Sequence, residues 1–168
     1  METYQLQSGA YSIRPLHTTE ALLYKTIRLE AIRQEPVMFR CSTPAEADLS
    51  DADWVQRIQH PRIVFGLFEH DNLIGMTSML FLDEEEAYLG QSYIRKAYRG
   101  LGLAALFYKA RMDWALKLKL KRLSVSHRES NFISKAANQR AGFSYTHRES
   151  ADWLDGTQED VLYYVLEL

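Results

Sequence analysis

A glycine-rich segment in the middle of the chain has the residue types that hold phosphate groups. It reads Arg99-Gly100-Leu101-Gly102-Leu103-Ala104 and joins an apolar, strand-like segment to an amphipathic, helix-like one. Gly100 and Gly102 permit positive φ and close approach, so several backbone amides can turn toward one anion. The dipole of the following helix and the charge of Arg99 add to this attraction. We therefore expect a phosphate site here, with a tight turn that binds nothing as the alternative.

Two well-known phosphate-binding motifs do not fit this segment. A Walker loop continues into Gly-Lys-Ser/Thr, whereas Leu103-Ala104-Ala105 supplies neither the lysine nor the hydroxyl. A dinucleotide-binding turn needs a third glycine, where this chain has Ala105, and it follows the first strand of a βαβ unit. Both of these site classes are excluded.

The pattern that fits is Arg-x-x-Gly-x-Ala, which resembles the pyrophosphate-binding signature of the GNAT superfamily of acyl-CoA-dependent N-acyltransferases. The resemblance extends over residues 85–145 through further motifs in the family's order. They are a strand-four pair, a fifth strand, an Asn-x-x-Ser sequence and a Gly-Phe sequence: Tyr93-Ile94, Leu123-Ser124-Val125, Asn131-Phe132-Ile133-Ser134 and Ala141-Gly142-Phe143.

This resemblance implies an N-acetyltransferase that moves the acetyl group from acetyl-CoA to a primary amine by direct attack in a ternary complex. CoA is then the cosubstrate, and its pantetheine arm lies along the fourth strand like an added strand, with the amide of Ile94 donating to the thioester carbonyl. The residues implied in CoA binding are Tyr93, Ile94, Arg99, Gly100, Leu101, Gly102, Leu103, Ala104, Asn131 and Ser134.

Acyl transfer also needs a base, because an amine with a pKa of about 10 is mostly protonated at neutral pH. Glu86 follows an acidic turn, at the start of the strand where family members often keep a carboxylate, and His127 ends the next strand. Both are candidate bases. A solvated turn and a packed strand histidine are the respective structural alternatives.

The proton for the leaving thiolate is the point at which the chain departs from the family pattern. Asn138 stands four residues before the Gly-Phe pair, where many members have a tyrosine acid, and an amide cannot act as an acid. The helix resembles more closely that of the ribosomal-protein N-terminal acetyltransferases, which implies that Ser134 donates a hydrogen bond to the thiolate. The alternative is that Ser134 caps the helix beside Asn131.

Strand and helix patterns around these motifs follow an order that resembles the GNAT fold. The resemblance implies one α/β (α+β) domain over residues 1–168, with a mixed, mostly antiparallel, twisted sheet of about seven strands and about four helices on both faces. The periodicities predict strands at 11–15, 62–69, 73–82, 88–94, 122–127, 143–147 and 161–166, and helices at 21–32, 51–60, 103–118 and 133–141.

The composition of the chain further narrows the classes of protein to which it can belong. The chain has 168 residues, 46% of them hydrophobic, which suits one domain, and a net charge of -2 disfavours a nucleic-acid binder. No apolar run reaches the ~18 residues that cross a membrane. Cys41 is the single cysteine and the first twenty residues lack a signal-peptide core, so we expect a cytoplasmic protein. The five histidines are scattered, so no metal is expected.

Several alternatives stay open. A non-catalytic acyl-CoA-binding module that lost its acid would keep the same motifs, and an unrelated α/β interaction domain would share only the glycine-rich turn. The acceptor is either a small-molecule amine or a peptide or protein amine, because the segments 33–50 and 148–160 carry no readable motif. The edge of the final hairpin would permit a homodimer.

Overall fold

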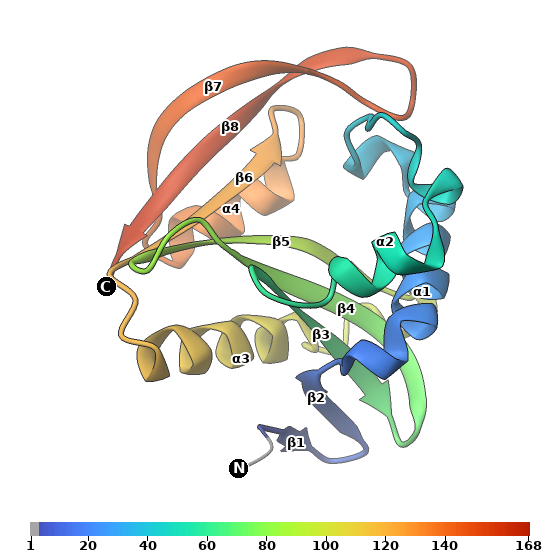
Figure 1. The fold of residues 1–168 in the computed structure, drawn as a ribbon. Coiled ribbons are helices and arrows are strands. Elements are labelled where there is room, and N and C mark those ends of the chain that lie inside the picture. Colours follow the sequence, from blue (N-terminus) through green and yellow to red (C-terminus); the bar gives the residue numbers. More distant parts are fainter. Residues whose placement is uncertain (1–3) are drawn as a thin grey trace.

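One mixed sheet of eight strands runs through the computed structural model, which describes residues 4–168 (Figure 1). The strand order is β1-β2-β3-β4-β5-β6-β8-β7, and every neighbouring pair is antiparallel except β5 and β6. The strands are β1 (Leu6–Ser8), β2 (Tyr11–Pro15), β3 (Arg62–Glu69), β4 (Asn72–Phe81), β5 (Glu86–Ile94), β6 (Arg122–Arg128), β7 (Ser144–Asp152) and β8 (Gln158–Glu167).

Within residues 4–168, four α-helices accompany the sheet, as predicted. They are α1 (Ala21–Gln34), α2 (Asp51–Gln56), α3 (Ala104–Lys117) and α4 (Phe132–Arg140). Short 3-10 turns precede or link them, among them Lys96–Tyr98 just before the glycine-rich segment. The predicted fold class is confirmed, with β1 as an additional strand and with α2 ending at Gln56 rather than near His60.

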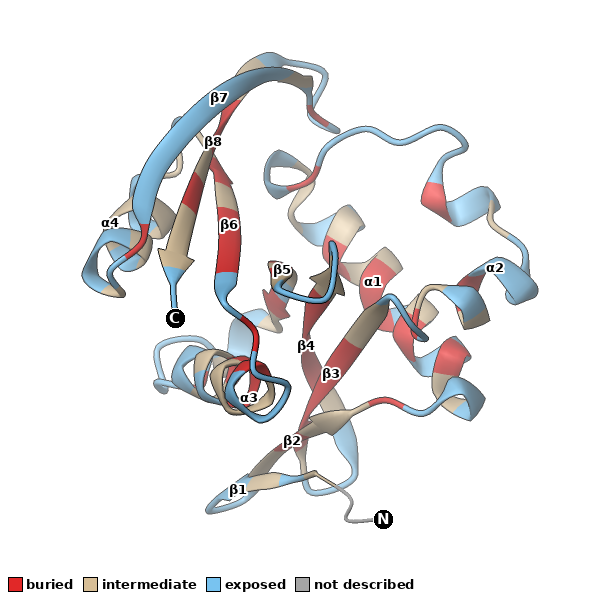
Figure 2. Ribbon diagram, turned by 60° about the vertical axis from the view of Figure 1, so that its left-hand side comes forward, coloured by how far each residue is buried: buried red, intermediate tan, exposed pale blue. Residues whose placement is uncertain are grey.

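Helices cover both faces of the sheet because β3 and β4 are apolar on both faces. Figure 2 shows α1 and α3 on opposite sides of β3 and β4. On β3, Val64 and Phe68 pack on the side of α1, whereas Phe65 and Leu67 pack on the side of α3. Each fully buried side chain of this kind contributes roughly 1.5–3 kcal/mol to the free energy of folding. The two resulting cores hold the central strands rigidly between the helix layers.

The final hairpin is longer than its sequence pattern predicted. β7 spans Ser144–Asp152, although an end near His147 was expected. Almost all of its residues are exposed, since β7 is an edge strand whose one partner among the described strands is β8 (Figure 2). Without a buried face the strand has no hydrophobic alternation, so its length could not be deduced from periodicity.

The centre of the sheet is split. β5 and β6 pair in parallel through three residues each, ending at Tyr88 opposite Ser124, and then diverge (Figure 1). β5 is also bulged, because Ser78 and Met76 of β4 oppose Gly90 and Tyr93 of β5. The extra residue coincides with a positive φ of 56° at Gln91. A bulge bends its strand, so the edge of β5 facing β6 runs without a strand partner from residue 89 to residue 94.

Candidate functional site

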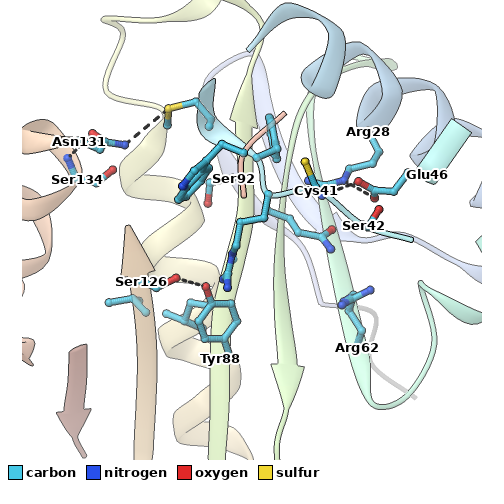
Figure 3. Close-up of a pocket in the computed structure, with 18 of the residues that line it drawn as sticks. Arg28, Cys41, Ser42, Glu46, Arg62, Tyr88, Ser92, Ser126, Asn131 and Ser134 are labelled. Carbon is cyan, nitrogen blue, oxygen red and sulfur yellow. Dashed lines mark hydrogen bonds and ion pairs between the residues drawn. The ribbon is translucent and has the colours of Figure 1, made fainter. Parts of the chain in front are cut away.

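A cavity of about 490 Å³ opens where β5 and β6 separate (Figure 3). β5 lines it from Tyr88 to Ser92, and β6 contributes Val125 and Ser126. One side is formed by the start of α4, with Asn131 and Ser134, and the opposite side carries Arg28, Glu46 and Arg62 (Figure 3).

A second hollow of about 420 Å³, here called the slot, adjoins the cavity because the two share Met38, Phe39 and Ser92. Three elements line both hollows. β5 lines the slot with Ile94 and Tyr93 and the cavity with Gly90, and α3 lines the slot with Ala104 and Phe107 and the cavity with Arg111. On α4, Ile133 lines the slot and Ser134 lines the cavity. Slot and cavity therefore form one path that starts beside the glycine-rich segment.

The glycine-rich segment has the predicted backbone. Gly100 and Gly102 have φ values of 79° and 77°, and a Cβ at either position would meet nothing within 4 Å. The positive φ therefore requires glycine, and the space beside it is open. Within residues 4–168, no carbonyl or side chain accepts a hydrogen bond from the amides of residues 100 to 103. Free amides before the first turn of α3 can bind an anion.

Arg99 lies at the mouth of the slot with its guanidinium already engaged. Its Nε donates to the carbonyl oxygen of Ile94 and its Nη1 to the carboxylate of Glu35, each at 2.8 Å. The guanidinium also lies 5.7 Å from the ring centroid of Tyr93, whose hydroxyl donates to Glu30. Arg99 thus ties the end of β5 to the end of α1, beside the predicted phosphate site.

The start of α4 shows which residue caps the helix. The side chain of Asn131 caps the helix by accepting from the backbone N–H of Ser134 at 3.1 Å. The hydroxyl of Ser134 makes no hydrogen bond to any described residue, and Ser134 lines the cavity. Asn138, one turn further along, lines it too. The cap therefore comes from Asn131, and the capping role suggested for Ser134 is wrong.

His127 does not face the cavity, so the expectation of a base at the acceptor cleft is corrected. Only 5% of the residue is exposed. Its Nδ1 lies 2.7 Å from the carbonyl oxygen of Arg128, which requires a proton on Nδ1, so Nε2 accepts from the hydroxyl of Tyr164 at 2.9 Å. Both ring nitrogens are thus occupied. The preceding residue on β6, Ser126, lines the cavity instead.

Glu86 also lies outside the lining. It pairs in register with Arg122 at the closed end of the two strands, and its carboxylate lies 3.4 Å from that guanidinium. Two hydroxyl groups line the cavity at the point where the strands part. They belong to Tyr88 and Ser126 and form a short hydrogen bond with each other (Figure 3). Sequence patterns could not find this pair, because it depends on the register between two strands that are distant in the chain.

Charged residues make up much of the remaining lining. Five arginines contribute, Arg28, Arg40, Arg57, Arg62 and Arg111, together with the carboxylate of Glu46. Burial raises the pKa of Glu46, but hydrogen bonds from Arg28 and Arg57 outweigh it and lower the pKa below the ordinary value. Glu46 is therefore an ionised structural partner of two arginines.

Between residues 4 and 168, no three His, Cys, Asp or Glu side chains are grouped so that they could hold a metal ion. No helix in that range is long and apolar enough to span a membrane.

Comparison with known proteins identifies a family whose sequence profile matches this chain. The sequence profile of the acetyltransferase (GNAT) family matches residues 27–143. No curated protein sequence matches the chain.

Solved structures share the fold. They include the ribosomal-protein-S5-alanine acetyltransferase from Vibrio fischeri, with a TM-score of 0.78 and 15% identity over 98% of this chain and 96% of that one. RimJ from Mycobacterium smegmatis, in complex with CoA-disulfide, has a TM-score of 0.74 and 16% identity over 98% and 86%. A Salmonella typhimurium acetyltransferase that modifies the N-terminal serine of ribosomal protein L7/L12 has a TM-score of 0.73 and 16% identity over 98% and 99%.

The assignment of the α4 cap predicts that two substitutions at the start of this helix differ in their effect on stability. Asn131→Ala should lower the free energy of unfolding by about 1 kcal/mol, because it removes the acceptor for an end amide of the helix. Ser134→Ala should change stability little, since its hydroxyl bonds to no described residue. Urea denaturation measures both. A larger loss for Ser134→Ala than for Asn131→Ala would show that serine is the cap.

Proposed function

Because the chain belongs to the acetyltransferase (GNAT) family, we propose that it transfers the acetyl group of acetyl-CoA to a primary amine. The amine nitrogen attacks the thioester carbon directly in a ternary complex, the C–S bond breaks, and CoA leaves as a thiolate that is protonated. The observation that carries this proposal is the continuous path from the free amides of the glycine-rich segment, through the slot, to the cavity.

In this proposal the pyrophosphate of CoA binds the amides of residues 100 to 103, at the positive end of the α3 dipole. The pantetheine arm follows the slot and bonds to the free edge of β5 as an added strand. The slot supplies apolar contacts to this arm through Ile94, Phe107 and Ile133. In this proposal the phosphate site also uses the backbone of Leu101, Leu103 and Ala104. Free amides, a free strand edge and an apolar wall all match one phosphate-bearing chain with amide groups.

The thioester then lies at the junction of slot and cavity, beside Ser92. Ser134 lines the cavity with an unbonded hydroxyl, which suits it to donate a hydrogen bond to the leaving thiolate. That bond strengthens as negative charge develops on sulfur, which is the condition for lowering the barrier. Since Glu86 and His127 lie away from the cavity, the proton of the amine leaves through water in the open cavity, beside the hydroxyls of Tyr88 and Ser126.

The second candidate is a non-catalytic acyl-CoA-binding module. The observation that favours it is Asn138, which lines the cavity where many family members have a tyrosine acid. Both candidates bind CoA, and only the enzyme releases free thiol when an amine is present. The acceptors named for two structural neighbours are ribosomal proteins. This supports a peptide or protein amine as an acceptor class, in addition to a small-molecule amine. A cytoplasmic location and a homodimer through the β7 edge stay predictions.

Loss of the phosphate site should abolish CoA binding. Gly102→Glu places bulk and negative charge where the pyrophosphate binds, so calorimetry should detect no CoA binding to the folded variant. Gly9→Glu is the matched control, because Gly9 also has a positive φ and open space around it but lies in the β1–β2 turn. Unchanged CoA affinity in folded Gly102→Glu would refute this placement of the pyrophosphate.

Turnover tests the chemistry. With acetyl-CoA and a panel of amines, the wild-type protein should release thiol, and Ser134→Ala should lower kcat while leaving CoA affinity unchanged, because the bond forms mainly in the transition state. Ser150→Ala, an exposed serine on β7, serves as the control. Asn138→Tyr should bring no gain. A marked gain, with no effect of Ser134→Ala, would instead identify a protein that lacks an effective acid.

A further inference from the structure

The cavity carries more positive charge than its own carboxylate balances. Of the described lining residues, Glu46 is the one acid against five arginines. It is already bound by two of them: Nε and Nη2 of Arg28 donate to its two oxygens at 2.9 and 3.2 Å, and Nη1 of Arg57 donates to one. Nothing in the cavity lining therefore neutralises the remaining guanidinium groups.

Three of the arginines have unused or uncompensated groups. Arg28 is only 8% exposed, and its buried Nη1 bonds to nothing among residues 4–168. The Nε of Arg62 is likewise buried without a partner in that range. Arg111, also 8% exposed, donates Nε to the carbonyl oxygen of Phe107 and meets no carboxylate of the described chain.

The pKa shifts agree with this picture. Burial lowers the pKa of Arg111 to about 10. Burial, together with the positive charges of Arg57 and Arg28, lowers the pKa of Arg62. Holding unpaired guanidinium groups in a partly desolvated cavity is costly, and an anionic ligand would remove that cost. A guanidinium also has the planar fork that matches carboxylate and phosphate oxygens.

We propose that the acceptor is an amine that also bears a carboxylate or phosphate, and that this anion binds the wall formed by Arg28, Arg57 and Arg62. The inference rests on the proposed acetyl transfer and names the substrate class of that site. Figure 3 shows this wall, through Arg28 and Arg62, across the cavity from Ser134. An acceptor held by its anion at the wall therefore extends its amine toward the thioester.

The phosphates of CoA do not account for these arginines. Along α3 the order from the glycine-rich segment is Ala104, then Phe107 in the slot, then Arg111 in the cavity. Seven residues of helix separate the first from the last, about 10 Å along the axis. The wall residues line the cavity and not the slot. They are thus left for the acceptor, and the same charge repels a polyamine.

Matched acceptors test the inference. Thiol release with acetyl-CoA would be compared for glutamate and its diamide, phosphoethanolamine and ethanolamine, and the peptide Ser-Asp-Glu and its Ser-Asn-Gln amide counterpart, with spermidine as a cation. The anionic member of at least one pair should have the higher kcat/KM. Which pair responds distinguishes a small acceptor from a peptide, and a carboxylate from a phosphate.

Arg62→Gln should lower kcat/KM for the anionic member about tenfold to a hundredfold, the value of a charged hydrogen bond, and leave the neutral member and CoA affinity unchanged. Arg140→Gln, an exposed arginine at the end of α4, is the control and should change neither. Arg57→Gln, at a second arginine of the wall, should give the same selective loss and serves as the test should Arg62→Gln fail to fold. Equal rates within every pair, preference for spermidine, or lower CoA affinity in Arg62→Gln would overturn the inference.

A binding measurement separates this inference from the transfer reaction. Inorganic phosphate or glutarate should raise the melting temperature of the CoA-loaded wild type and of Arg140→Gln, and not that of Arg62→Gln. If none of the amines leads to thiol release while the anions still stabilise the protein, the transfer reaction is refuted and the anion site stands. Absence of stabilisation by either anion would overturn the anion site, whether or not transfer occurs.

Discussion

The separation of β5 from β6 after three paired residues is the constraint on which the rest of the site depends. A strand edge in the middle of a sheet leaves backbone amides and carbonyls that need partners. The bulge opposite Met76 and Ser78 turns β5 away, and β6 is held in place by its pairing with β8. The opening is thus rigid on both sides, because two apolar cores fix the central strands and the hairpin fixes β6.

Each element around the opening supplies one requirement of a thioester-using enzyme. The glycine-rich turn offers free amides before α3, the unpaired edge of β5 offers backbone groups along the slot, and α4 presents Ser134 to the cavity. The arginines add charge that the protein itself does not neutralise. Unpaired buried charge lowers stability, so its presence beside the proposed reacting centre supports a role in binding a ligand more than in holding the fold.

The resemblance to the GNAT superfamily predicted the fold class, and local features of the sequence predicted the glycine-rich turn before α3 and the start of α4. The positive φ values of Gly100 and Gly102 follow directly from their motif. Residues whose position depends on strand register or on contacts between distant segments were not predictable. Tyr88 meets Ser126 only because β5 and β6 pair before they separate, and Arg28 meets Glu46 only after the segment following α1 folds back. The histidine after Ser126 was misplaced for the same reason, since alternation alone does not say which face is open.

Amide hydrogen exchange, resolved residue by residue with and without CoA, tests the central claim most directly. In the free protein, the amides of residues 100 to 103 and those between residues 89 and 94 that do not bond to β4 should exchange rapidly, because they lack partners. Saturation with CoA should protect both sets together, while the β7 edge stays unchanged. Protection of the glycine-rich segment without the β5 edge, or of neither, would contradict a pantetheine arm bound as an added strand in the split sheet.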